Sequence, residues 1–158
     1  MQRWSILIKA MQPAGALCLV CVALLAATCN FGCRGEAISE AAALASTESF
    51  NRAIDAFAAG NFSAARTDLD AALAGRGGLN ADQYVEALLK RSICLSDAGE
   101  FEAAQVDIDS ATQGVTEIDQ LLIAEAFWLA KRGDQAGSMK KLAEAKRINP
   151  KAKLPGVN

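Results

Sequence analysis

Two Asp-x-Asp pairs, Asp68/Asp70 and Asp107/Asp109, are the residues of this 158-residue chain whose type and spacing most resemble a site for chemistry. Paired carboxylates bind hard metal ions when several oxygens converge. The sequence contains no histidine, so it lacks a Ser-His-Asp or Cys-His nucleophile and the two-histidine zinc helix. Any chemistry of the chain would therefore depend on carboxylates and cysteines.

Both aspartate pairs lie in a stretch that the chain contains twice. Residues 59–75 read AGNFSAARTDLDAALAG, and residues 98–114 read AGEFEAAQVDIDSATQG. Residues two apart on a helix do not share a face. We therefore interpret the aspartates as solvent-facing positions on either side of Leu69 and Ile108. The sequence predicts no metal site, no cofactor and no catalytic residue, and an enzyme is not expected.

A third, more diverged copy, KRGDQAGSMKKLAEAKRINP, occupies residues 131–150. The glycines of the three copies, Gly60, Gly99 and Gly133, are 39 and 34 residues apart. Repetition at a period of 20 to 50 residues is typical of solenoid proteins. Apolar residues precede and follow each glycine at helical spacing. The sequence thus predicts an all-α fold of three helix-turn-helix hairpins.

The expected helices cover residues 47–59 and 62–73 in the first hairpin. The second hairpin should begin at Asn80 or Asp82, turn at residues 99–100 and return over 101–112. The third should begin near Thr116 or Asp119, turn at residues 133–134 and end before Pro150. Residues 75–78 read Gly-Arg-Gly-Gly and are interpreted as a linker, because a phosphate loop would need a lysine and a preceding strand.

The repeat resembles the tetratricopeptide repeat over residues 47–150, which implies a short α-solenoid. The resemblance depends on small residues at the three positions where paired helices touch: Ala53, Ala65, Ala72, Ser92, Ala104, Ala111, Ala126, Ser138 and Ala145. Pro150 matches the terminal proline, which the first two copies lack. Arg91 stands where the family has an aliphatic residue, and Gly137 lies inside the last helix.

We divide the chain into four parts on these patterns. Residues 1–33 form a signal peptide or membrane-anchor segment, and residues 34–46 form an acidic, alanine-rich approach segment or helix. Residues 47–150 form the repeat domain, with repeats at about 47–79, 85–118 and 119–150. Residues 151–158 form a C-terminal tail.

The N-terminus is typical of a secretory signal. Arg3 and Lys9 precede an apolar run over residues 14–27, and no acidic residue occurs before Glu36. The run is short for a membrane-spanning helix, and Pro13 separates it from the residues before it. We expect an exported protein of the periplasm or cell envelope, with a retained membrane anchor as the alternative.

Two cysteines come near the pattern of a bacterial lipidation site. Cys29 follows Leu-Ala-Ala-Thr, and Cys33 follows a glycine. The alternative is ordinary cleavage, for example after Ala37, which would remove four of the five cysteines. Cys29 and Cys33 lack a histidine or a second cysteine pair for a metal site. Cys94 lies inside an apolar helix, where buried packing is its expected role.

The resemblance also implies a concave groove lined by the first helix of each hairpin. The mapped positions are Phe50, Ile54, Phe57, Leu89, Ser96, Ile93, Ile123, Phe127 and Lys131. Relatives that bind a terminal carboxylate have polar and basic residues there, whereas this set is mostly apolar and suits an amphipathic helix. The alternative is that these residues form core, or that the approach helix fills the groove.

Charge is distributed unevenly along the chain. Residues 92–130 contain eight acidic and no basic residues, whereas residues 131–153 contain eight basic and two acidic ones. Neighbouring repeats that complement each other explain this pattern; the alternative is a basic end that meets anionic lipid or an acidic partner. Nucleic acid is not an expected partner of an exported chain.

These observations predict an exported, non-catalytic scaffold that binds a partner protein in an apolar groove. The alternative is a small self-associating accessory lipoprotein of a cell-envelope assembly. A solenoid needs a polar capping element, and none is evident after the last repeat. An uncovered edge near Phe127 and Trp128 is therefore a candidate surface for a homodimer.

Overall fold

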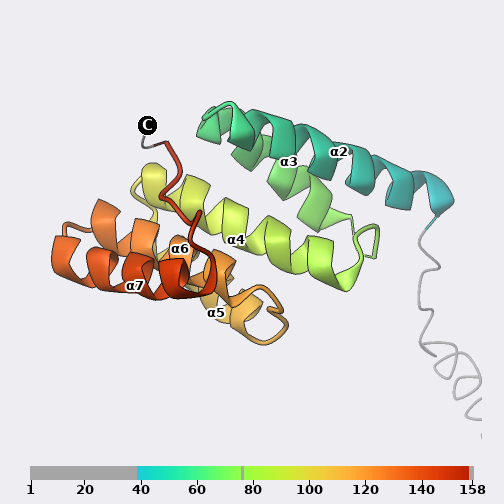
Figure 1. The fold of residues 1–158 in the computed structure, drawn as a ribbon. Coiled ribbons are helices and arrows are strands. Elements are labelled where there is room, and N and C mark those ends of the chain that lie inside the picture. The colour runs from blue at the N-terminus through green and yellow to red at the C-terminus, as the bar shows by residue number, and fades with distance from the viewer. Residues whose placement is uncertain (1–38, 76, 157–158) are drawn as a thin grey trace, which may run out of the picture. The chain divides into compact units, whose positions relative to one another are not determined.

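The computed structural model describes residues 39–75 and 77–156, which form six α-helices and no strand. The prediction of an all-α fold is confirmed for this part of the chain. Figure 1 shows the helices in order along the chain: α2 (Glu40–Ala58), α3 (Phe62–Ala74), α4 (Ala81–Asp97), α5 (Phe101–Thr112), α6 (Ile118–Lys131) and α7 (Gln135–Ile148). None of these helices is both long enough and apolar enough to cross a membrane.

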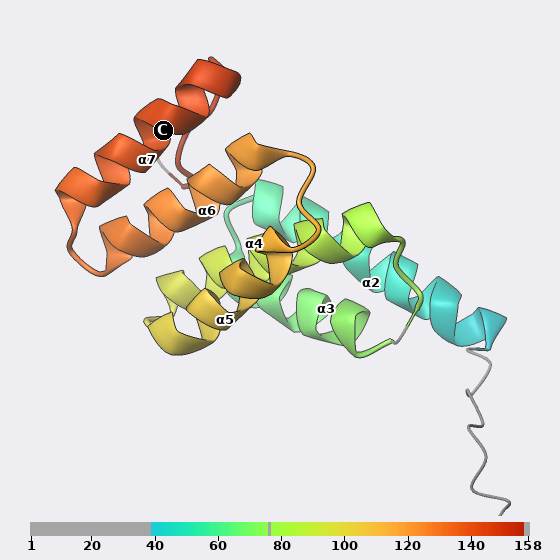
Figure 2. The same ribbon diagram turned by 90° about the horizontal axis from the view of Figure 1, so that it is seen from below.

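The helices pack as three consecutive hairpins, α2 with α3, α4 with α5 and α6 with α7 (Figure 2). Each hairpin turns at the predicted glycine, and Gly60, Gly99 and Gly133 have φ angles of 75°, 79° and 90°. The residue after each glycine donates its N–H to a carbonyl five residues earlier, as Asn61 does to Ala56 at 2.9 Å. Glycine adopts this left-handed C-terminal conformation at little cost, so the repeated glycine fixes each turn.

Small residues lie where the paired helices meet. All nine positions that the sequence analysis singled out have exposed fractions of 2% or less: Ala53, Ala65, Ala72, Ser92, Ala104, Ala111, Ala126, Ser138 and Ala145. The predicted burial of these small residues is therefore confirmed. Larger side chains, such as Leu69 and Ile108, fill the space between them and are also buried.

The N-terminal helix is longer than the repeat pattern suggested. Residues 40–46 are the first turns of α2 and continue directly into its repeat portion, after an N-cap at Ser39 that accepts the Ala42 N–H. The approach segment is thus part of the first hairpin, since no breaker separates it from the helix that follows.

Two glycines of the predicted linker, Gly75 and Gly78, lie against α2. Ser46 donates a hydrogen bond to the Gly75 carbonyl at 3.4 Å, and Thr47 donates one to the Gly78 carbonyl at 3.1 Å. A Cβ atom at Gly78 would collide with Ser46 and lie 3.0 Å from the Ala43 carbonyl oxygen. The close approach of two backbones therefore explains glycine at this position.

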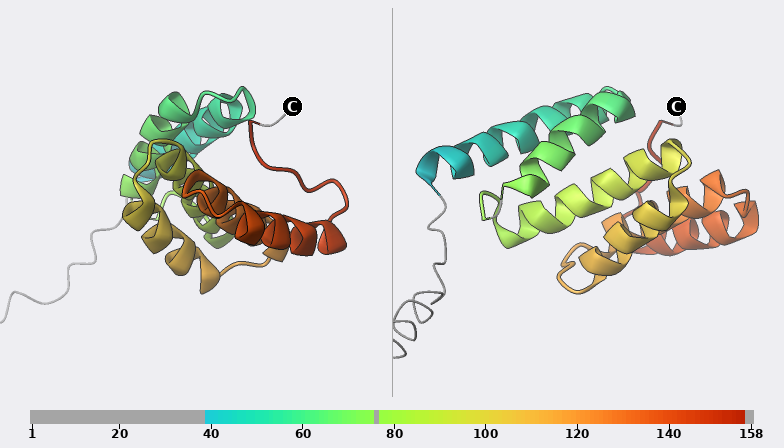
Figure 3. Two further views of the ribbon diagram at one scale, coloured as in Figure 1. Left: turned by 90° about the vertical axis from the view of Figure 1, so that its left-hand side faces the viewer. Right: turned by 180° about the vertical axis from the view of Figure 1, so that it is seen from behind.

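The residues after α7 cross back over the helices (Figure 3). Ala152 is 4% exposed and packs in a cluster with Leu122 and Ile123 of α6. Leu154 packs against the central core, and Gly156 lies beside the Phe62 ring of α3. The C-terminal tail thus forms part of the packed structure.

Candidate functional site

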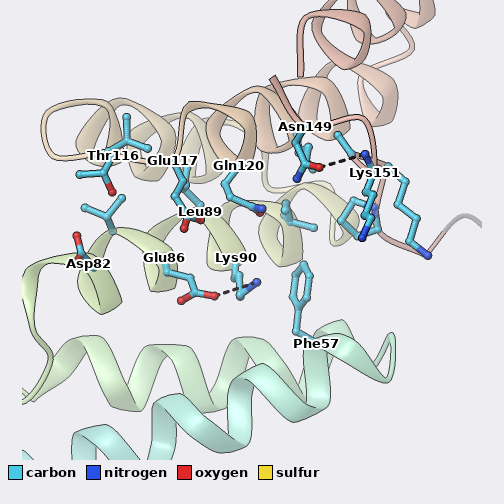
Figure 4. A pocket seen from close by; sticks show the side chains of 17 residues that line it. Phe57, Asp82, Glu86, Leu89, Lys90, Thr116, Glu117, Gln120, Asn149 and Lys151 are labelled. Atoms are coloured by element: carbon cyan, nitrogen blue, oxygen red, sulfur yellow. Dashed lines mark hydrogen bonds and ion pairs between the residues drawn. The ribbon is translucent and has the colours of Figure 1, made fainter. Parts of the chain in front are cut away.

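A pocket of about 360 Å³ lies between α4, the start of α6 and the C-terminal tail (Figure 4). Its apolar floor consists of Val85, Leu89 and Ile93 of α4 and Ile123 of α6, with Phe57 of α2 at one end. The three α4 residues are four positions apart, and side chains at this spacing share one face of a helix. These three apolar residues of α4 therefore line the pocket together.

Acidic side chains gather at one end of the pocket. Asp82 and Glu86 lie on the first two turns of α4, and Glu117 precedes the first residue of α6. Figure 4 shows Asp82, Thr116 and Glu117 at the same end. The capping box at Asn80 starts α4 there and so fixes where Asp82 and Glu86 lie.

Lysines of the C-terminal tail, Lys151 and Lys153, also line the pocket, and Figure 4 shows Lys151 at the end away from Asp82. Asn149 positions the tail: its side-chain amide donates to Asp119 at 2.8 Å, and its oxygen accepts the Lys151 N–H at 3.1 Å. The pocket therefore has a negative end at Asp82 and Glu117 and a positive end at the tail lysines, with the apolar floor and the Glu86–Lys90 pair between them.

Lys90 has two neighbours within the pocket. Its ammonium lies 3.3 Å from the Glu86 carboxylate and 4.7 Å from the centroid of the Phe57 ring. A cation over an aromatic face is attracted by the ring quadrupole. These contacts hold Lys90 at the middle of the wall formed by α4.

Four of the seven apolar residues predicted to line a groove line this pocket, namely Phe57, Leu89, Ile93 and Ile123. The other three, Phe50, Ile54 and Phe127, do not line it. Phe50 and Phe127 are 5% and 4% exposed, and Ile54 packs against the cluster that contains Phe50. Phe127 contacts Phe62 edge to face, with ring centroids 6.0 Å apart. These three side chains belong to the core.

Ser96 and Lys131, the two polar positions of the predicted groove, also lie elsewhere. Ser96 is 1% exposed and donates to the Ser92 carbonyl. Lys131 pairs with Asp97 at 2.6 Å and lies over the Phe127 ring. Both residues stabilise contacts within or between helices.

The sequence analysis did not identify the charged ends of the pocket or the tail that closes it. Filling of the groove by the approach segment was one of the alternatives considered, whereas residues 149–155 contribute five of the pocket residues. Leu154 and Pro155 are apolar residues that follow the last helix. They indicated that the C-terminal tail packs against the helices. At the acidic end, Asp82 of α4 and Glu117 of the α5–α6 connection line the same pocket. They are 35 residues apart in the sequence, so their proximity could not be predicted from local residue spacing.

The prediction that the aspartate pairs face solvent is wrong for Asp107. Asp107 is 4% exposed and accepts two hydrogen bonds of 2.7 Å from Arg91. Asp70 receives a third hydrogen bond from Arg91 at 3.1 Å. The bond to Asp107 raises the pKa of the Arg91 guanidinium against the opposing effect of burial. Arg91 can lie between these helices because it has a buried carboxylate to bind.

The other two aspartates lie nearer the surface. Asp68 pairs with Arg52 at 3.0 Å, and Asp109 accepts a hydrogen bond of 2.7 Å from Gln105. Among the described residues, no group of three or more cysteine, aspartate or glutamate side chains converges as a metal site. The first aspartate of each pair, Asp68 and Asp107, thus recurs because it makes the same interhelical contact in its hairpin.

Part of the uneven charge is matched within the fold. The acidic residues of 92–130 that pair with a basic side chain are Asp97 with Lys131, Glu100 with Arg66, Asp107 with Arg91 and Glu125 with Lys141. Two of these four pairs, Glu100 with Arg66 and Asp97 with Lys131, connect neighbouring hairpins, and the other two lie within one hairpin. These two pairs agree with the simpler interpretation, in which neighbouring repeats complement each other.

Cys94 is buried in α4, as expected, with an exposed fraction of 3%. Burial raises the pKa of the Cys94 thiol to about 12.

Trp128, at the predicted edge of the array, is half-buried and donates its ring N–H to the Phe101 carbonyl at 3.0 Å. The predicted lipidation sites, Cys29 and Cys33, lie outside the described residues.

Comparison with family models, with curated proteins and with solved structures finds no significant match to this chain.

Proposed function

We propose that this chain is a non-catalytic binding module that holds a peptide or helix of a partner protein in the pocket between α4 and α6. The observation that carries the proposal is the pocket, which offers about 360 Å³ over the apolar floor of Leu89, Ile93 and Ile123. Cavities of about 300–1,000 Å³ are typical binding sites, and eight of the 17 residues that line this pocket are apolar.

The proposed architecture is a short solenoid of tetratricopeptide type. Three features recur at equivalent positions of each hairpin and support it: the glycine turn, the buried small residues and an ion pair between the two helices. In a solenoid each unit contacts mainly its neighbours. The contact pattern here, in which α3 packs on α4 and α4 on α6, agrees with that arrangement.

The proposed location is the periplasm or cell envelope. The support is the pattern of residues 1–33, with a basic start and an apolar run, and the two cysteines Cys29 and Cys33 as candidate lipid carriers. Labelling the chain with a radioactive fatty acid, in parallel with Cys29→Ser and Cys33→Ser variants, tests the anchor. A label that survives both substitutions together excludes lipidation at these cysteines.

A peptide library tests the binding function. Random twelve-residue peptides are selected against the full chain, and the selected peptides are tested against Gln120→Trp, which places a large ring in the pocket. Ile118→Trp is the matched control, since Ile118 is 45% exposed on the same helix and does not line the pocket. The proposal expects peptides whose binding Gln120→Trp abolishes and Ile118→Trp preserves. Equal binding to all three chains would contradict it.

A further inference from the structure

We infer that the pocket recognises an extended peptide segment that carries a basic side chain at one end and an acidic side chain at the other. This inference rests on the proposed function and deepens it, because it assigns the chemistry of the partner. It follows from the order of charges along the pocket and from the distance between them.

The two ends of the pocket offer charges that the protein does not neutralise itself. Within residues 39–75 and 77–156, none of Asp82, Glu117, Lys151 and Lys153 forms an ion pair. All four are exposed at the pocket rim. Other charged side chains of the fold are also without an ion pair, but these four line one pocket, where their charges can act on a single ligand.

The negative set and the positive set lie at opposite ends of the pocket. Asp82 lies on the first turn of α4, and Lys90 lies eight residues later on the same helix, between Asp82 and Lys151 in Figure 4. A helix rises about 1.5 Å per residue, so these residues are about 12 Å apart along the axis. Lys90 itself pairs with Glu86, so a ligand must bring its two opposite charges to at least this separation to reach the tail lysines.

An extended backbone satisfies that separation with few residues. A strand advances about 3.3 Å per residue, and alternate side chains point the same way. Residues i and i+4 of an extended segment are therefore about 13 Å apart on one side, with residue i+2 between them. A basic residue at i, an aliphatic residue at i+2 and an acidic residue at i+4 would meet the acidic end, the apolar floor and the lysines. A helix would place i and i+4 only about 6 Å apart.

The floor also favours one apolar side chain at the centre. Leu89, Ile93 and Ile123 offer carbon surface there, and Gln120 adds a single amide beside them. An apolar side chain gains from this surface, whereas a charged one would lose its hydration. The pocket should therefore prefer peptides in which a basic, an apolar and an acidic side chain follow in this order, in either chain direction.

Four acetylated and amidated peptides test the inference on the full chain by fluorescence anisotropy. They are Lys-Ser-Leu-Ser-Glu, Lys-Ser-Leu-Ser-Lys, Glu-Ser-Leu-Ser-Glu and Gln-Ser-Leu-Ser-Gln. The first is expected to bind at least fivefold more tightly than each of the others. Asp82→Asn with Glu117→Lys should shift the preference to the Glu/Glu peptide, and Lys151→Glu with Lys153→Glu should shift it to the Lys/Lys peptide.

The outcomes separate this inference from the proposed function. If the library yields peptides that depend on the pocket, but the Lys/Glu and Gln/Gln peptides bind equally, the charge rule is overturned and the binding function stands. If the charge variants leave the preference unchanged, the rule is likewise overturned. If neither the library nor any of the four peptides shows binding that Gln120→Trp removes, both proposals fail.

Discussion

Arg91 of α4 donates two hydrogen bonds of 2.7 Å to Asp107 of α5, one to each carboxylate oxygen. The same guanidinium reaches Asp70 of α3 at 3.1 Å, so it ties the second hairpin to the first. At the equivalent position of the first hairpin Arg52 pairs with Asp68. The third hairpin has the pair with its charges exchanged, Glu125 on the first helix and Lys141 on the second. One interhelical ion pair therefore recurs in all three hairpins, with no fixed polarity.

Replacing Arg91 by Met should destabilise the chain by about 3 kcal/mol, because Asp107 would keep its charge without a partner in a buried position. Loss of one partner of a buried ion pair costs about 3–5 kcal/mol. We expect the lower end of this range because the Arg91 side chain is 24% exposed. The measurement is the free energy of unfolding in urea, followed by circular dichroism. Arg52→Met is the matched control. Arg52 is 58% exposed, so its loss should cost no more than about 1 kcal/mol. Equal costs for the two variants would contradict the special role of Arg91.

The exchanged pair of the third hairpin allows a charge-swap experiment. Glu125→Lys alone places two ammonium groups together and should lower the free energy of unfolding, as should Lys141→Glu alone. The double variant restores an ion pair with the polarity found in the other hairpins, and it should recover most of the loss. The coupling between such partly exposed groups is expected to be about 0.2–1 kcal/mol. A double variant whose loss equals the sum of the two single losses would show that polarity is fixed here.

The hairpins were predictable from sequence because their signals are local. Glycine turns, apolar stripes and small contact residues recur at constant spacing, and the helices begin and end within a few residues of the expected limits. The exception is α2, which begins at Glu40. Alanine-rich residues 40–46 carry no repeat signal but have high helix propensity, and Ser39 caps them.

The pocket was predictable only in part, because its residues come from segments distant in sequence. The stripe of Leu89 and Ile93 was visible from its spacing in α4. The buried state of Asp107 was not visible, since an Asp on a helix is normally solvated and its partner lies 16 residues away. The tail lysines were counted in a basic terminal region, yet nothing local indicated that Ala152 would dock on α6 and bring them to the pocket.

Glu100 should make stability depend on pH in the acid range. The hydrogen bond from Arg66 lowers the pKa of Glu100 below its usual value. A carboxyl whose pKa is lower in the folded state contributes stability above its unfolded pKa, and this contribution is lost as the pH falls through the folded pKa. Glu100→Gln should therefore be less stable than the unmodified chain at pH 7, and the difference should shrink below about pH 4. A difference that stays constant down to pH 2.5 would contradict the pairing.

Cys94 should resist thiol reagents while the chain is folded. Burial raises its pKa to about 12, so at pH 8 only about one thiol in ten thousand is ionised, and the thiolate is the reactive form. Native chains are treated with iodoacetamide, and modification of the peptide that contains Cys94 is measured by mass spectrometry. Chains unfolded in urea serve as the positive control. Labelling of the native chain as fast as that of the unfolded chain would contradict the buried position.

Ala104 tests whether small residues set the distance between paired helices. It is completely buried on the face of α5 that packs against α4, whereas Ala103, its neighbour in sequence, is exposed. Ala104→Leu adds three carbons to a filled contact and should lower the free energy of unfolding by about 1–3 kcal/mol. Ala103→Leu introduces the same side chain into the same helix and should change it by less than about 0.5 kcal/mol. Both variants change helix propensity by the same substitution in the same helix. The difference between their free energies of unfolding therefore measures the effect of packing. An unchanged melting temperature of Ala104→Leu would contradict the claim that contact between α4 and α5 requires a small residue at this position.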